Sequence, residues 1–120
     1  MRPKIDTSWF GSITVEGKRY EYDIIIRLSG KVRKRRKALS KAVYGTSHTI
    51  SLAEIKDLYR KKADRVIVGS GQEGMAHLSQ EAADFLRSSG CRVDVSPTPQ
   101  AIELWNDAQG EVLGLFHITC

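Results

Sequence analysis

The sequence is poor in cysteine, in asparagine and in long apolar runs. It contains two cysteines, Cys91 and Cys120, and one asparagine, Asn106. Apolar runs such as Ile24-Ile25-Ile26 fall far short of the roughly 20 residues that a membrane-spanning helix needs. Residues 1–6 also lack the apolar segment of a signal peptide. We therefore expect no membrane insertion and a cytoplasmic location.

Length and composition predict a single domain over residues 1–120. Of the 120 residues, 41% are hydrophobic and 28% are charged, a balance typical of a folded globular chain. The formal net charge is +5, which favours anionic partners in general. Net charge concerns steering and solubility, so it does not by itself indicate a fold or an activity.

The first half of the chain predicts a β-hairpin. A strand is expected over 9–15, then a turn at Glu16-Gly17-Lys18 in which Gly17 takes the positive φ. Residues 20–28 alternate between apolar and polar side chains, the two-residue period of a strand with one buried face. A short third strand through Val32 is possible before a run of basic residues.

The second half predicts alternating helices and strands. Ser51, Ser79 and Thr98 each precede a helical pattern and are expected to cap it, with Glu54 completing a capping box and Pro99 at the first helical position. Strands are expected over 65–68, 92–95 and 112–119. The last is apolar on both faces, which indicates a central place in the sheet. This order predicts an α/β fold with a mixed sheet, an N-terminal β-hairpin and helices on both faces.

A glycine-rich loop is the first candidate ligand site. Gly69, Ser70 and Gly71 follow a buried strand, and ligands of open α/β sheets bind outside the carboxyl ends of the strands. Thr98 begins a helix at the same predicted edge, where N–H groups favour anions, and His48 is a third candidate lining residue. The spacing is neither a dinucleotide fingerprint nor a phosphate-binding P-loop. A tight turn and a simple helix cap explain the same residues equally well.

Two further features suggest partners or chemistry. Five basic residues could grip the phosphates of a nucleic acid, although a solvated surface is the commoner meaning of such a run: Arg33, Lys34, Arg35, Arg36 and Lys37. Cys91 starts one predicted strand and Cys120 ends another, so antiparallel neighbours would allow a disulfide between them; two free thiols are the alternative. The three histidines lack metal-ligand spacing, and we predict no metal, no cofactor and no recognisable catalytic motif.

Several segments in order resemble one known family. They include 10–13, 23–26, His48, 68–71, Thr98 with Ala101 and Asn106, and 117–120. Together they resemble the uncharacterised archaeal-type domain shared with the adipogenesis-associated protein and with the mitochondrial assembly factor for NADH dehydrogenase (complex I). Ser70 stands where that family usually has threonine, which keeps the hydroxyl.

The resemblance implies a three-layer α/β fold and a role in assembly, with no established catalytic activity. We therefore predict a non-catalytic binding or assembly module whose partner is an unknown protein or a second copy of this chain. One alternative is a protein, either a binding protein or an enzyme, that takes a small molecule or anion at the glycine loop and Thr98. The other alternative is electrostatic nucleic-acid binding through the basic run.

Overall fold

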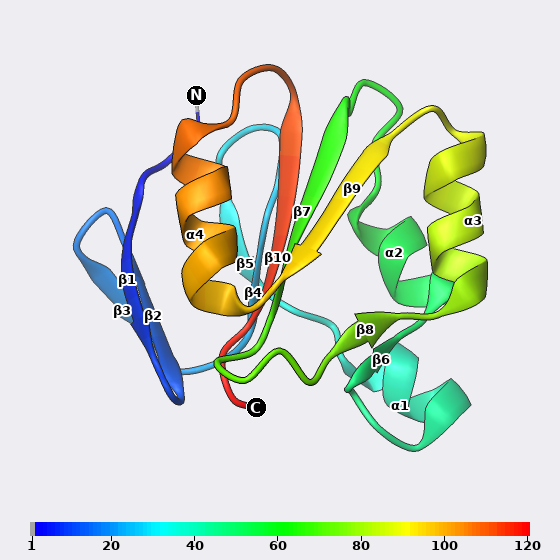
Figure 1. Ribbon diagram of the computed structural model, residues 1–120, viewed down its shortest axis with the longest axis horizontal. Coiled ribbons are helices and arrows are strands. Elements are labelled where there is room, and N and C mark those ends of the chain that lie inside the picture. The colour runs from blue at the N-terminus through cyan, green and yellow to red at the C-terminus, as the bar shows by residue number, and fades with distance from the viewer. Residues whose placement is uncertain (1) are drawn as a thin grey trace.

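A five-stranded mixed sheet forms the centre of the computed structural model, which describes residues 2–120 (Figure 1). The two central neighbours, β10 and β7, run parallel, β9 continues the parallel part, and β4 and β5 pair antiparallel on the other side. The predicted mixed sheet and the central position of the last strand are therefore confirmed. The order across the sheet is β5 (Val32–Lys34), β4 (Ile24–Ile26), β10 (Val112–His117), β7 (Arg65–Ser70) and β9 (Arg92–Ser96).

The N-terminal hairpin is a separate three-stranded antiparallel sheet made of β1 (Ile5–Trp9), β2 (Ser12–Val15) and β3 (Lys18–Tyr20). Gly17 has a φ of 79° as predicted, and Glu16 also has a positive φ, 48°. Two consecutive positive φ values form the tight turn whose twist matches that of the flanking strands.

The continuous strand predicted over 20–28 is wrong. The chain leaves the small sheet after Tyr20 and enters the large one at Ile24. Asp23, at the break, is buried and forms an ion pair with the buried Arg35. The alternation of apolar residues is real, and Tyr20, Ile24 and Ile26 contact the same apolar cluster. The two halves pair with different strands, however, and periodicity alone does not show this.

Four helices complete the structure: α1 (Ala38–Tyr44), α2 (Leu52–Leu58), α3 (Gln80–Ser88) and α4 (Thr98–Asp107). Ser51 and Ser79 cap α2 and α3 as predicted, because each hydroxyl accepts the N–H of the residue three positions later. Helix α1 was not predicted; it begins without a side-chain cap, and Ser40 is its one buried residue. None of the helices within residues 2–120 is long and apolar enough to cross a membrane.

Two apolar clusters pack on opposite faces of the large sheet. Helix α4 and the small sheet cover one face, and α2 and α3 cover the other, which confirms the three-layer arrangement (Figure 1). Strand β10 serves both clusters, since Val112 and Phe116 point to α4 while Leu113 and Leu115 point to the other side. The strands β6 (Thr49–Ile50) and β8 (His77–Leu78) form a short parallel pair beside α2.

Gly114 lets α4 lie close to the centre of the sheet. The rings of Trp105 and Phe116 stack edge to face at 5.8 Å over this position. A Cβ on Gly114 would lie 2.6 Å from the Phe116 ring and 2.9 Å from the Trp105 ring. The absence of a side chain here therefore sets the distance between the helix and the strand that ends at the candidate site.

Candidate functional site

The candidate residues at the carboxyl edge of the sheet do come together. Strand β7 ends at Ser70, and the Gly71 N–H donates to Thr98 Oγ1 at 2.9 Å. The Thr98 hydroxyl in turn donates to the carbonyl of His117, the last residue of β10, at 2.6 Å. The prediction that Thr98 caps α4 is wrong: Pro97 is the N-cap residue, and Thr98 is the first helical residue. Its hydroxyl joins two strand ends instead, because it is fully buried against them.

The glycine loop contacts the last residues of the chain. Gln72 N–H donates to Thr119 O at 2.7 Å, and Met75 N–H donates to Cys120 O at 3.0 Å. The N–H groups of Gly74 and Ala76 are bonded within the loop itself. The N–H groups of Gln72, Gly74, Met75 and Ala76 are therefore engaged by protein carbonyls, so the geometry does not favour an anion nest here.

Gly71 is the position where the loop and the segment 118–120 approach most closely. Its φ is +104°, and a Cβ there would lie 2.6 Å from Cys120 O and closer still to Cys120 C. Both the backbone conformation and the available space exclude a side chain. The glycine that suggested a ligand loop is explained by this contact between backbones.

His48 lies beside the same edge, as the candidate set required. Its ring packs edge to face on that of His117, with centroids 5.4 Å apart. Cys120 Sγ lies 3.8 Å from His48 Nε2. His48 and Cys120 are both half-buried, so this contact is partly open to solvent.

Asp23 and His117 form a buried pair that the sequence did not reveal. His117 Nδ1 lies 2.7 Å from Asp23 Oδ2, and the Ile118 N–H donates to Asp23 Oδ1 at 2.9 Å. Burial raises the pKa of Asp23, but the hydrogen bond and charge of His117, the Ile118 N–H and Arg35 outweigh it and hold the pKa below its ordinary value. His117 Nε2 is 3.1 Å from Thr119 Oγ1. The Thr119 hydroxyl, the His117 imidazole and the Asp23 carboxylate thus follow one another as in a catalytic triad. His117 is only 3% exposed, however, which favours a structural role.

Arg35 is buried in the interior and does not belong to a nucleic-acid surface, which corrects the predicted set. Its guanidinium donates to Asp23 Oδ2 and to Ser47 O, each at 2.8 Å, and makes a two-point contact with the Glu54 carboxylate. Burial lowers the pKa of Arg35, but Glu54 and Asp23 more than compensate and raise it above its ordinary value. Arg33, Lys34, Arg36 and Lys37 remain exposed.

Glu54 closes this buried ion network, which comprises Asp23, Arg35, Glu54 and His117. The Glu54 N–H is capped by Ser51 Oγ at 3.2 Å, but the reciprocal bond of the predicted capping box is not formed, because the Ser51 N–H donates to Ser40 Oγ at 2.9 Å. The Glu54 carboxylate binds Arg35 and the Ser40 hydroxyl instead. Within residues 2–120 no buried side-chain nitrogen or oxygen lacks a hydrogen-bond partner. Over the same residues, no group of three or more histidine, cysteine or acidic side chains is arranged to hold a metal ion. The network is satisfied by its own members together with Ser40, Ser47 O, the Ile118 N–H and Thr119.

The predicted disulfide is not formed, and both thiols are free. The prediction assumed antiparallel neighbours, whereas β9 and β10 both run parallel to β7. Cys91 precedes β9 at the end of the sheet where Arg65 starts β7, and Cys120 follows β10 at the opposite end. Burial, with a contribution from Asp64, raises the pKa of the Cys91 thiol and makes its thiolate less available.

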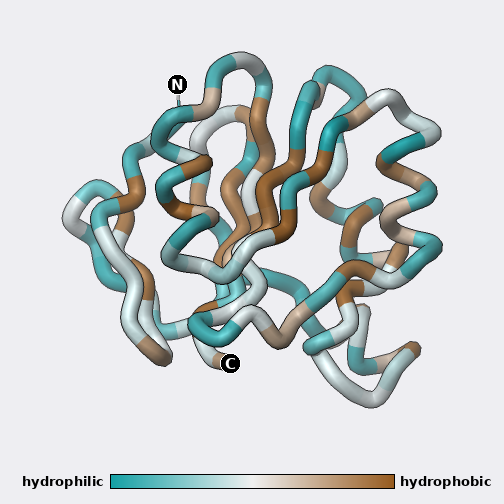
Figure 2. The backbone as a smooth tube through the Cα atoms, in the orientation of Figure 1, coloured by the Kyte–Doolittle hydropathy of each residue, from teal (hydrophilic) through white to brown (hydrophobic). Residues whose placement is uncertain are grey.

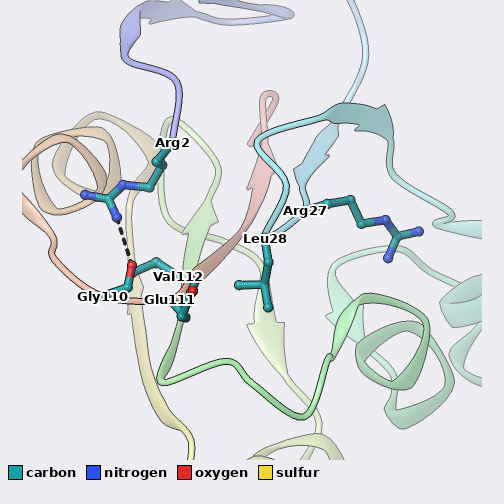
Figure 3. A pocket seen from close by; sticks show the side chains of 6 residues that line it. All are labelled: Arg2, Arg27, Leu28, Gly110, Glu111 and Val112. Carbon is teal, nitrogen blue, oxygen red and sulfur yellow. Dashed lines mark hydrogen bonds between the residues drawn. The ribbon is translucent and has the colours of Figure 1, made fainter.

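One cavity lies at the amino end of β10, far from the candidate edge. It has a volume of about 110 Å³ and is lined in part by Arg2, Leu28 and Val112 (Figure 3). Arg2 donates to Gly110 O at 3.5 Å. Figure 3 shows the Arg27 guanidinium pointing away from this cavity, and its Nη1 donates to Asp57 O. The two arginines do not converge on a common ligand.

Large apolar side chains are exposed at the carboxyl edge. Trp9, the last residue of β1, is 68% exposed, and Phe10, in the turn that follows it, is 67% exposed. Met75 of the glycine loop is 58% exposed. The hairpin and the loop are linked by a hydrogen bond between Ser8 and Gln72, and Gly11 N–H donates to Ile118 O. Figure 2 shows the apolar tip of this hairpin at the same end of the molecule as residue 120. We call Trp9, Phe10 and Met75 the apolar rim.

Taken together, these features define a three-layer α/β domain whose ligand edge is occupied by its own chain and bordered by an apolar rim. The chain belongs to the family described as a protein of unknown function (DUF498/DUF598), which matches residues 5–115. The resemblance seen in the sequence is thereby confirmed at the level of this family.

Solved structures agree with this assignment. A conserved hypothetical protein from Pyrococcus horikoshii is 32% identical, with a TM-score of 0.88 over 98% of this chain and 99% of that one. A protein named MT938 is 31% identical, with a TM-score of 0.84 over the same shares. A Mth938-like domain from Bordetella pertussis shares the fold, with 17% identity and a TM-score of 0.63 over 96% of this chain and 85% of that one.

Proposed function

We propose that this protein is a non-catalytic binding module that recruits a protein partner through the apolar rim. The observation that carries the proposal is the exposure of Trp9 and Phe10, adjacent aromatic side chains that are each about two thirds accessible. Exposed aromatic clusters mark interaction sites, and tryptophan is enriched among the residues that dominate binding energy. The engaged N–H groups of the glycine loop support binding of a protein over binding of a small anion.

The resemblance to the adipogenesis-associated protein and to the complex I assembly factor supports a role in assembly. Such a role needs a surface for partners, and the apolar rim is a surface of that kind. A single domain acting in the cytoplasm, and a second copy of the chain as one possible partner, belong to the same proposal.

A proximity experiment tests this function. A photo-crosslinking amino acid at position 10 is expected to capture a defined partner in an extract of the source cells. Untagged protein is then added as a competitor for the partner. Wild-type competitor should suppress the capture, whereas competitor that carries Trp9→Ser and Phe10→Ser should not. The matched control is competitor with Val43→Ser, which removes an exposed apolar side chain, 61% accessible, from α1. This control should suppress the capture as wild type does.

The capture experiment and a thermal-shift measurement together separate the alternatives. A captured partner that the Trp9→Ser, Phe10→Ser protein displaces as well as wild type does would contradict the apolar rim. A clear rise in melting temperature with a nucleotide or sugar phosphate would contradict the binding-module proposal and favour a ligand site, because a ligand at one hundred times its Kd stabilises by about 2.7 kcal/mol.

A further inference from the structure

A groove separates the free edge of the small sheet from the free edge of the large one. Its volume is about 480 Å³, and it is lined by residues of β3, of β5 and of the turn before β5. The floor is apolar: Val15 is buried, and Tyr20 and Val32 pack against the core cluster beneath it. Figure 1 shows the small sheet standing beside the β4–β5 end of the large sheet. This edge groove lies on different residues from the apolar rim.

Both strands that border the edge groove are terminal strands of their sheets. Among the strands of residues 2–120, β5 pairs only with β4, and β3 pairs only with β2. Arg27 N–H donates to Lys31 O, and Arg35 N–H donates to Asp23 O. These two bonds show which residue pairs of the β4–β5 ladder are the hydrogen-bonded ones. Because bonded pairs alternate along an antiparallel ladder, the N–H and C=O groups of Val32 and Lys34 point to the free edge.

One of these edge groups already accepts a hydrogen bond from outside the ladder. The exposed Arg33 guanidinium donates to Val32 O at 3.1 Å. A backbone N–H of an added strand can take the same place, which would release the guanidinium for a carboxylate. The edge groove therefore offers the two elements of strand addition, free backbone groups and an apolar floor for alternate side chains.

The charges around the edge groove select the partner. Lys18, Lys31 and Arg33 line it, against one carboxylate, Glu16. Glu16 Oε2 accepts the N–H of Lys4 at 3.3 Å. With net charge +5, a second copy of this chain would be repelled, whereas a segment rich in Asp and Glu would be attracted.

The tyrosines near the edge groove favour a peptide over a single-stranded nucleic acid. Lys18 Nζ lies 5.2 Å from the centroid of the Tyr20 ring, and Lys34 Nζ lies 5.4 Å from that of Tyr22. The two rings also pack edge to face at 5.9 Å. Each ring thus has a lysine ammonium of the protein over it, which a stacking base would have to displace.

We propose that the edge groove binds an extended acidic segment of a partner protein by strand addition to β5. This inference goes beyond the proposed function, because it assigns a second surface and the chemistry of its ligand. The added strand pairs with the outward groups of Val32 and Lys34, and its carboxylates contact Lys31, Arg33 and Lys18.

Fluorescence anisotropy with the purified chain tests the proposal. The probe is a fluorescein-labelled peptide of about ten alternating Glu and Val residues, a length that covers one strand. Its comparison probes are the same peptide with Lys in place of Glu and an oligothymidine of about the same length. We expect saturable binding of the Glu peptide only.

Two matched double substitutions locate the binding. Lys31→Glu with Arg33→Glu reverses two charges at the edge groove, and Lys61→Glu with Lys62→Glu reverses two exposed charges after α2. The first pair should weaken binding of the Glu peptide by about tenfold or more, since two attractive contacts at the edge groove are lost and replaced by repulsion. The second pair should change the affinity much less. Hydrogen exchange should show protection of the Val32 and Lys34 amides on binding, which a purely electrostatic contact would not produce.

Several outcomes would overturn the inference. They are absence of saturable binding of the Glu peptide, equal weakening by the two double substitutions, unprotected amides in β5, and tighter binding of oligothymidine. In each of these cases capture at position 10 would still test the apolar rim separately. Unchanged melting temperatures of the two double variants would show that loss of binding does not come from unfolding.

Discussion

At the scale of single residues, Arg35 has the largest expected effect on stability. It lies in the interior between two carboxylates, so its removal leaves Asp23 and Glu54 without their shared cation. Arg35→Met should lower the free energy of unfolding by about 3–5 kcal/mol, the usual cost of breaking a buried ion pair. Urea unfolding at neutral pH measures the difference.

The neighbouring Arg36 is the control. Its side chain is 62% exposed and pairs with Asp57 near the surface. Arg36→Met should change stability by about 0.5 kcal/mol or less. Similar losses for the two variants would contradict the role given to the buried ion network.

The second residue-scale prediction concerns pH. The pKa of Asp23 is lowered in the folded state, so its stabilising contribution is complete above the unfolded value of about 3.9. That contribution should decline as the pH falls below this value and be lost as it falls through the folded pKa. The stability difference between wild type and Asp23→Asn should therefore be smaller at pH 3 than at pH 6 in urea titrations. Asp107→Asn, which removes an exposed carboxylate from α4, should show no such convergence.

A third prediction separates backbone strain from crowding at Gly71. Both Gly71 and Gly45 have positive φ, but a Cβ on Gly45 would meet nothing within 4 Å. Gly45→Ala should cost about 1 kcal/mol, the price of the left-handed conformation alone. Gly71→Ala should cost clearly more, about 2 kcal/mol or above, because its Cβ also collides with Cys120. Thermal unfolding of both variants checks this, and equal shifts would contradict the close contact between the two segments.

At the scale of elements, Asn106 fastens the small sheet to α4. Its Oδ1 accepts the Ile5 N–H at 3.0 Å, and its Nδ2 donates to Ile5 O at 2.9 Å. The amide thus behaves as a strand partner for the start of β1. Asn106→Ala should cost about 1–2 kcal/mol by leaving these groups unpaired, and it should speed hydrogen exchange of the Ile5 amide.

The elements also show what local patterns could predict. The Ser51 and Ser79 caps, the Glu16-Gly17 turn and the doubly buried β10 follow from neighbouring residues, and the structure confirms them. The break between β3 and β4 was missed because the apolar alternation continues across it. What ends the strand is the ion pairing of Asp23 with residues that are distant in sequence.

At the scale of the whole molecule, the sequence predicted which residues meet at the candidate edge but not what they bind. The sequence brought Gly69, Gly71, Thr98 and His48 to one place, since strand ends in a parallel sheet share an edge. It could not show that the carbonyls of Thr119 and Cys120 accept the Gln72 and Met75 N–H groups of that loop, because such contacts depend on where the chain turns after β10. It also left Arg35 among surface cations, since its burial follows from Asp23 and Glu54, 12 and 19 positions away in the sequence.

The buried ion network has a consequence for how the chain folds. His117 and Asp23 are 94 positions apart, and Arg35 lies between Asp23 and Glu54. Until β10 docks against β4, Asp23 lacks the imidazole and the Ile118 amide that offset its desolvation. An early intermediate built from the first half of the chain therefore has to keep these charges hydrated. The network thus disfavours partly folded states in which β10 is not yet docked against β4.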